Sequence, residues 1–221
     1  MKAVLDKRLS AVSGYVSGKT LLDVGTDHAK LPVWLLLENK IEKALATDIN
    51  EGPLKFAKEL IKETNFEEKI SAFINDGIKG IDLSEVSDIS ICGMGGELIA
   101  EILEKGKDEH YYNINFILNP MTRDDELRRY LSLNGFVIRD ETAVCQNGKV
   151  YSVMKASFED GKREISSLEA LIGPFRGESE EEKAYIDKVI NRYKKQLCDN
   201  EKREKSEKII RELEGIKNDR W

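Results

Sequence analysis

The sequence contains few of the residues that build metal sites and disulfides. Its 221 residues include three cysteines and two histidines. The cysteines, Cys92, Cys145 and Cys198, stand far apart, and no CxxC or Cys/His cluster is present. We therefore expect no metal site. Three unpaired thiols are typical of a protein from a reducing compartment.

Long apolar runs and a secretion signal are also missing from the sequence. No stretch of about 18 apolar residues predicts a transmembrane helix. The first residues do not form a signal-peptide pattern, so we expect a cytoplasmic protein with no membrane contact. Nothing in the sequence implies a protein partner.

A strong excess of positive charge, which is common in nucleic-acid-binding domains, is absent from the chain as a whole. The formal net charge is −6, which argues mildly against a nucleic-acid partner. The distribution is uneven, however, because basic residues outnumber acidic ones in the range 183–221. An RNA-binding role for that segment therefore stays open.

Apolar runs alternate with helical patterns over about residues 1–158. Strands are predicted at 20–24, 43–47, 70–74, 88–92, 115–118, 136–139 and 150–157. Helices are predicted at 31–39, 52–65, 97–105 and 124–133. This alternation predicts an α/β, doubly wound, seven-stranded and mostly parallel sheet, with the last two strands forming a hairpin.

The C-terminal part of the chain has a different pattern. Residues 159–182 are polar and are expected to form a connector between two domains. In residues 183–221, apolar side chains recur at a spacing of three to four, at 186, 189, 190, 193 and 197 and again at 209, 210, 213 and 216. We expect a coiled-coil-like helical hairpin, and one continuous helix is the alternative.

The turn after the first strand lacks two of the three glycines of a dinucleotide site. The stretch reads LLDVGTDHAKLP over residues 21–32, with Gly25 as its only glycine. A pyrophosphate needs close backbone approach from further glycines at this turn. Asp23 and Asp27 flank Gly25, and their carboxylates would repel a pyrophosphate. The sequence therefore disfavours a dinucleotide here.

A cationic ligand without phosphate, S-adenosyl-L-methionine, suits this turn better. Acids or glycine turns follow four successive strands, and the carboxyl ends of parallel strands face one site. Asp48 can accept hydrogen bonds from a ribose diol, and Asp76 can accept from an adenine amino group. The alternative is that each turn only caps a loop. The predicted cofactor-binding residues are Asp23, Gly25, Thr26, Asp27, Asp48, Ile49, Asn75, Asp76, Gly77, Gly93, Met94 and Gly95.

These segments, together with several others, resemble a known family. The stretches DKRLSAVSGYV, LLDVGTDHAKLP, ICGMGGELIAEIL, FILNP and VCQNGKVYSVMKA are similar to the bacterial tRNA (adenine-22-N1)-methyltransferases, the TrmK family. The resemblance covers essentially the whole chain. Two positions depart from the family pattern: Lys30 stands where an aromatic residue is expected, and Arg176 stands where an apolar residue is commoner.

The resemblance implies a Rossmann-like class I methyltransferase domain with a coiled-coil-like extension. It also implies methyl transfer from S-adenosyl-L-methionine to N1 of adenine 22 in the D-loop of tRNA. From the residues, Asp27 and its neighbour His28 are the candidate catalytic groups, because a carboxylate stabilises the cationic product ring. The alternatives are that Asp27 only binds the cofactor and that His28 only forms a hydrogen bond at the start of the helix.

Five basic residues are candidates for tRNA contact. They are Arg8, Lys30, Arg123, Arg128 and Arg129. The alternative is that such charges form solvated helix faces. Two further functions stay open at this point: a methyltransferase for another RNA or a small molecule, and an inactive methyltransferase fold that binds RNA.

Overall fold

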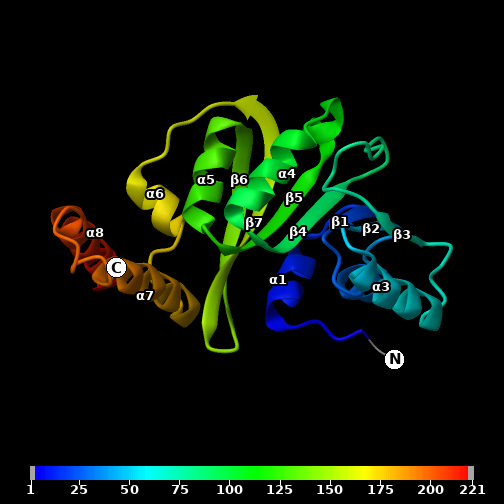
Figure 1. The fold of residues 1–221 in the computed structure, drawn as a ribbon, viewed down its shortest axis with the longest axis horizontal. Helices are drawn as coiled ribbons and strands as arrows, with labels where there is room; N and C mark the ends of the chain where they lie inside the picture. The colour runs from blue at the N-terminus through cyan, green and yellow to red at the C-terminus, as the bar shows by residue number, and fades with distance from the viewer. Residues whose placement is uncertain (1–2, 219–221) are drawn as a thin grey trace.

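The computed structural model describes residues 3–218, and at its centre lies a seven-stranded sheet (Figure 1). The strand order is β3-β2-β1-β4-β5-β7-β6. The strands β1 to β5 run parallel, and β7 is antiparallel to both of its neighbours. The predicted doubly wound α/β fold is confirmed. The strands are β1 (Thr20–Val24), β2 (Lys43–Asp48), β3 (Ile70–Ile74), β4 (Asp88–Gly95), β5 (Asn115–Thr122), β6 (Gly135–Gln146) and β7 (Lys149–Gly161).

Helices cover both faces of this sheet. One face packs against α1 (Lys7–Tyr15), α2 (Lys30–Leu37) and α3 (Glu51–Glu63). The other packs against α4 (Gly96–Lys105) and α5 (Asp124–Leu133), with a short 3₁₀ turn at Glu109–Asn113. Because both faces are covered, the central strands β1 and β5 are buried along most of their length, and β4 is buried over its first half. Among the described residues, no helix combines the length and the apolar character needed to cross a membrane.

The helix α1 is not among the helices that the sequence pattern predicts. Asp6 caps it by accepting a hydrogen bond from the Leu9 amide at 2.9 Å. Only Val12 and Ser13 of this helix are buried, so its apolar stripe is too short for a clear helical pattern. The helix packs on β5, β6 and β7, and this contact brings Arg8 to the carboxyl end of β5.

The carboxyl ends of β1 to β5 meet at one edge of the sheet. The chain steps outward from β1 to β2 and β3, then returns to pair β4 with the other side of β1. This reversal makes a topological switch point between β1 and β4, where ligands bind in doubly wound sheets. The turns that follow these strands therefore form the expected site.

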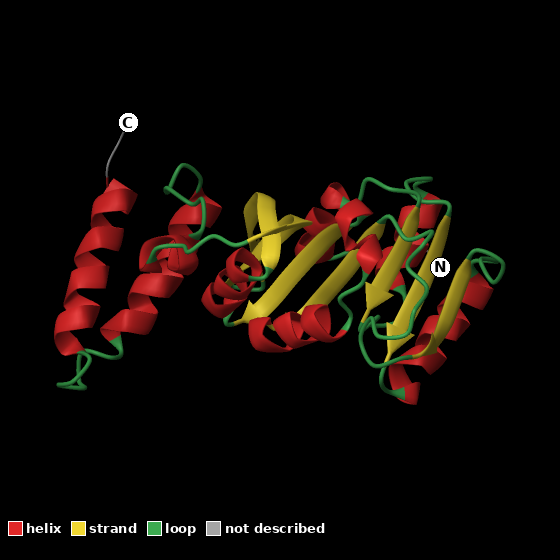
Figure 2. Cartoon of the chain, turned by 90° about the horizontal axis from the view of Figure 1, so that it is seen from above, coloured by secondary structure: helices red, strands yellow, loops and turns green. Residues whose placement is uncertain are grey.

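The helical hairpin predicted at the C-terminus consists of α7 (Glu180–Lys194) and α8 (Arg203–Asn218). Figures 1 and 2 show the two helices side by side beyond the β6 edge of the sheet. Ion pairs join them, from Lys217 to Asp187 at 2.6 Å and from Lys194 to Glu214 at 3.3 Å. Turns separate them, so the alternative of one continuous helix is wrong.

The range expected to be only a connector contains regular structure. The strand β7 continues to Gly161, and a helix, α6 (Ser167–Ile172), follows. A reciprocal capping box between Ser166 and Glu169 starts α6. The helix buries Ala170, Leu171 and Ile172 against α5 and α7. Its six residues are too few to show a helical period within a polar stretch, which is why the sequence pattern missed it.

Candidate active site

At the carboxyl end of β1, Asp23 lies beneath the turn that follows. Its two carboxylate oxygens accept hydrogen bonds from Thr26 and from Ser90 of β4, each at 2.6 Å. Burial raises the pKa of the Asp23 carboxyl, although the hydrogen bonds from Ser90 and Thr26 act in the opposite direction. The carboxylate thus fixes the turn to β4, and each oxygen keeps a lone pair for a ligand.

Two features of the structure favour glycine at position 25 of this turn. Gly25 has a φ of +73°, in the region that favours glycine. A β-carbon on Gly25 would lie 2.1 Å from the terminal methyl of Met94, which reaches over from the end of β4. The amides of Gly25 and Thr26 both donate to the Thr47 carbonyl at 2.8 Å. The turn is therefore held against both neighbouring strands, β2 and β4.

The next two residues of the turn, Asp27 and His28, project outward. The Asp27 side chain is 77% exposed, and its Oδ1 lies 3.2 Å from Nε2 of His28. His28 and Ala29 both have left-handed backbone conformations, with φ of 62° and 51°. Such conformations in non-glycine residues cost of order 1 kcal/mol each and concentrate at functional sites. The geometry accords with an exposed carboxylate oriented by a histidine.

Phe56 of α3 is a site residue that the sequence reasoning missed. Its ring stacks on the His28 ring with centroids 4.7 Å apart and planes at 10°. Phe56 is nevertheless half-exposed, so this stack forms an open aromatic surface beside Asp27. The available signal was an aromatic residue on α3 outside the apolar stripe of that helix. The stack favours the observed orientation of the His28 ring.

The turns after β2 and β3 lie next to this one. Oδ1 of Asp48 accepts a hydrogen bond from the Asn50 amide at 2.8 Å, and Ile49 is 64% exposed. The amide of Asn75 donates to the Asp48 carbonyl at 3.1 Å, which ties the two turns together. The Asn75 side chain donates to the Gly77 carbonyl at 3.0 Å, and Asp76 is exposed.

The irregular end of β4 supplies bare backbone. The pairing of β4 with β5 is irregular between Cys92 and Gly95, so the chain bulges at this point. Gly93 has a φ of +80°, and a β-carbon there would meet no atom within 4 Å. Open space thus lies beside Gly93. Gly95 is closer to its surroundings, since a β-carbon would approach the Thr122 hydroxyl to 3.3 Å.

Eleven of the twelve predicted cofactor residues therefore occupy four segments at adjacent strand ends, in the order 3-2-1-4, and the twelfth, Asp23, lies in β1 just before one of them. We call these segments (25–28, 48–50, 75–77 and 93–95) the strand-end site. Its chemistry fits S-adenosyl-L-methionine, because exposed carboxylates suit a cation, Ile49 offers an apolar surface, and Gly93 leaves room for a ligand. No group of three or more His, Cys, Asp or Glu within residues 3–218 is arranged to hold a metal ion.

The five predicted tRNA contacts have different environments. Arg8 lies close to the site but is engaged, donating to Asn119 Oδ1 and Asp6 Oδ2, each at 3.1 Å. Arg123 is exposed, and Lys30 and Arg129 are half-buried. The prediction for Arg128 is wrong, because the structure buries this side chain completely and no RNA could reach it. The sequence placed it on a helix but contained no sign of its buried partner, Glu141.

The fold and this chemistry together define an S-adenosyl-L-methionine-dependent methyltransferase of the doubly wound class. Residues 5–154 match the family described as methyltransferase domain. The chain is also 37% identical over 178 residues to the Bacillus subtilis tRNA (adenine(22)-N(1))-methyltransferase, covering 77% of this chain and 74% of that protein. The chain belongs to the tRNA (adenine(22)-N(1))-methyltransferase family.

Solved structures of similar proteins agree with this assignment. The B. subtilis m1A22 tRNA methyltransferase TrmK is 31% identical with a TM-score of 0.80, and the match covers 97% of this chain and 96% of that one. Sp1610 of Streptococcus pneumoniae, solved in complex with S-adenosyl-L-methionine, is 33% identical with a TM-score of 0.85. That match covers 97% of this chain and 100% of Sp1610, so the C-terminal extension belongs to the shared architecture.

Proposed function

We propose that this protein transfers a methyl group from S-adenosyl-L-methionine to N1 of adenine 22 in the D-loop of tRNA, in the cytoplasm. The observation that carries the proposal is the strand-end site, in which an exposed Asp27 carboxylate stands beside the acidic and glycine turns. The family of the chain supports the tRNA substrate and the position of the target adenine.

The reaction needs little acid–base chemistry. Adenine N1 carries an in-plane lone pair and is unprotonated at neutral pH, so it can attack an electrophilic methyl group without a general base. When bound, the cofactor would supply that methyl group from a sulfonium, and the neutral thioether S-adenosyl-L-homocysteine would be the leaving group. The work of the protein is then to align donor and acceptor and to exclude competing geometries.

The second task of the protein is to stabilise the charge of the product, and we assign it to the Asp27 carboxylate. Methylation at N1 leaves a positive charge on the adenine ring, and a fixed negative group stabilises that charge as it develops. His28, held by Phe56 and in contact with Asp27, orients the carboxylate. Asp48 would hold the ribose diol of the cofactor, Ile49 would pack on its adenine, and the backbone at Gly93 would leave space for the methyl group.

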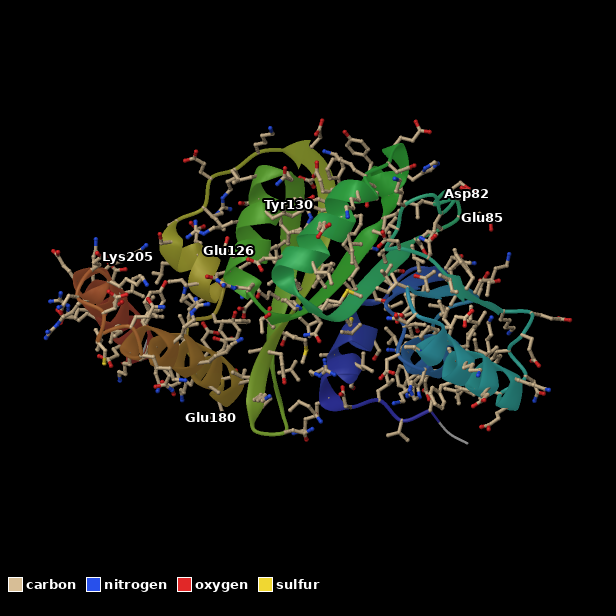
Figure 3. All side chains as sticks on the ribbon, in the orientation of Figure 1. Asp82, Glu85, Glu126, Tyr130, Glu180 and Lys205 are labelled. Carbon is tan, nitrogen blue, oxygen red and sulfur yellow. The ribbon has the colours of Figure 1, made fainter. Side chains whose placement is uncertain are left out.

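Adenine N1 lies on the Watson–Crick edge, so a paired target must be exposed before it reacts. We propose that Lys30, Arg123 and Arg129 meet the tRNA backbone around the site. Helix α8 extends the contact, with exposed Lys205 and Lys208 that form no ion pair within residues 3–218. In Figure 3, Lys205 lies on the end of the molecule formed by this helix.

Methylation of two tRNA transcripts tests the proposal. A transcript with adenine at position 22 should take up about one methyl group per molecule from labelled S-adenosyl-L-methionine. The same transcript with guanine at position 22 should take up none, and nucleoside mass spectrometry should identify 1-methyladenosine in the first product alone. Equal incorporation into both transcripts would reject the position, and a product other than 1-methyladenosine would reject the reaction.

A further inference from the structure

A cluster of buried charged and polar side chains lies outside the strand-end site, where the helical hairpin meets α5 and β6. Its members are Asp124 and Arg128 of α5, Glu141 of β6 and Tyr185 of α7, and all four are buried. A cavity of about 520 Å³ flanks the cluster between β6 and the segment 161–176. Arg128 has no free N–H group with which to bind a ligand in this cavity. We therefore attribute a structural role, rather than ligand binding, to the cluster.

The Arg128 guanidinium joins three elements of the structure. Its Nε and Nη2 donate to the Glu141 carboxylate, and Nη2 also donates to the Tyr185 hydroxyl at 2.9 Å. Its Nη1 donates to the Ala170 carbonyl at 2.7 Å and to that of Leu171 at 3.3 Å. Every N–H of the guanidinium is therefore bonded, to β6, α6 and α7 in turn.

Tyr185 links the Arg128–Glu141 ion pair to a second ion pair, between Asp124 and Lys188. Its hydroxyl accepts from Arg128 and donates to the Asp124 carboxylate, which also accepts from Lys188 of α7 at 3.0 Å. Burial alone would raise the pKa of the Asp124 carboxyl, but Lys188 and Arg128 beside it hold the pKa below its usual value. The negative charge of Asp124 thus persists in the buried position and fixes α7 to the first turn of α5.

The same turn of α5 contacts the strand-end site. A β-carbon at Gly96, the residue after the 93–95 segment, would lie 2.2 Å from the Arg123 carbonyl, which directly precedes α5. The glycine segment at the end of β4, the start of α5 and the middle of α7 are therefore linked by successive contacts. Figure 3 shows Glu180, the first residue of α7, beside the β6–β7 hairpin, on the side where β5 ends.

Apolar contacts already attach the hairpin, since Phe175, Ile186 and Leu213 share one core cluster with β6 and β7. Such contacts are non-directional, whereas a buried ionic network tolerates few orientations. Buried ion pairs add little net stability compared with apolar residues of the same size, and in some proteins they specify geometry instead. An orienting role therefore explains the network better than adhesion does.

We infer that Asp124, Arg128 and Tyr185 are positioning residues that hold the helical hairpin at a fixed orientation to the strand-end site, so that tRNA gripped by the hairpin presents one adenine to the methyl donor. The inference rests on the proposed function. It adds to the proposed tRNA binding by the hairpin, because it assigns these residues to the placement of the target base and not to the affinity for tRNA.

The test replaces Tyr185 with phenylalanine, which keeps the ring and its packing on Phe175 but removes both hydrogen bonds. The matched control is Tyr193→Phe on the same helix, whose hydroxyl makes no hydrogen bond within residues 3–218. Tyr185→Phe should lower kcat for tRNA methylation roughly 10- to 100-fold, because small displacements of a reacting group have effects of this size. Affinities for tRNA and for S-adenosyl-L-methionine should stay within about threefold of wild type.

A second variant, Asp124→Asn, separates positioning from simple electrostatics. Removing an acidic group should strengthen binding of a polyanion if charge alone matters. Positioning instead predicts the same fall in kcat as for Tyr185→Phe, while Lys188→Arg, which keeps the ion pair, should retain wild-type kcat.

The inference is overturned if folded Tyr185→Phe has the kcat of Tyr193→Phe. If Tyr185→Phe loses cofactor binding through misfolding, Asp124→Asn decides by the same criterion, and loss of folding in both variants would assign the cluster to stability alone. Failure of the wild-type protein to methylate tRNA would instead reject the proposed function.

Discussion

Replacing Asp27 with asparagine should lower kcat for tRNA methylation roughly 100-fold, because the neutral amide cannot balance charge developing on the adenine ring. The amide keeps the size of the side chain, and its oxygen can still meet a donor from His28. Affinity for S-adenosyl-L-methionine should change by less than about threefold, since Asp48 and the glycine turns remain. Single-turnover methylation at saturating cofactor measures the rate of the chemical step, and calorimetry measures the affinity.

The control for Asp27 is Asp82→Asn. Asp82 is an exposed carboxylate in the loop before β4, at the opposite edge of the sheet (Figure 3). The same loss of negative charge at that position should leave kcat unchanged. If Asp27→Asn instead keeps its kcat and loses cofactor affinity, Asp27 is only a cofactor ligand, and the charge-stabilising role must be given up.

Replacing Arg128 with methionine should destabilise the protein by about 3 to 5 kcal/mol, because it leaves the Glu141 carboxylate buried without its partner. Glu141 also accepts a hydrogen bond from the buried Ser152 hydroxyl, which cannot neutralise its charge. For a chain of this size the melting temperature should fall by roughly 6 to 20 °C. Urea unfolding followed by circular dichroism measures the free energy of unfolding.

Two further variants accompany Arg128→Met. Arg129→Met on the same helix removes an equal charge from a half-buried side chain and should cost less than about 1 kcal/mol. Adding Glu141→Gln to Arg128→Met removes the stranded charge and should restore part of the lost stability. Equal unfolding free energies for Arg128→Met and Arg129→Met would show that the buried pair does not hold this region together.

The strand-end site could be predicted from sequence because each of its parts is local. Short apolar runs followed by acidic or glycine turns identify β1 and β4 without knowledge of the fold. Parallel pairing then brings the turns together, since the carboxyl ends of the strands share one edge. For this reason the sequence pattern alone predicts that Asp27, Asp48 and Gly93 lie at one edge of the sheet.

The remaining features depend on contacts between distant segments. Arg128 follows Asp124 by one helical turn in a polar stretch, and only Glu141 and Tyr185 make its position buried. The stack of Phe56 on His28 joins α3 to the turn after β1, and the position of Phe56 outside the apolar stripe of α3 does not identify its partner. Long-range partners of this kind leave no periodic signal in one sequence.

A crystal structure with S-adenosyl-L-homocysteine, the demethylated form of the donor, tests most directly that the strand-end site binds the cofactor. We predict that the ribose hydroxyls lie within hydrogen-bond distance of Asp48 and that the adenine packs on Ile49. We also expect the sulfur beside the Gly93–Gly95 backbone, on the same side as Asp27. Density for the ligand at another edge of the sheet, or a ribose without contact to Asp48, would contradict this placement of the cofactor.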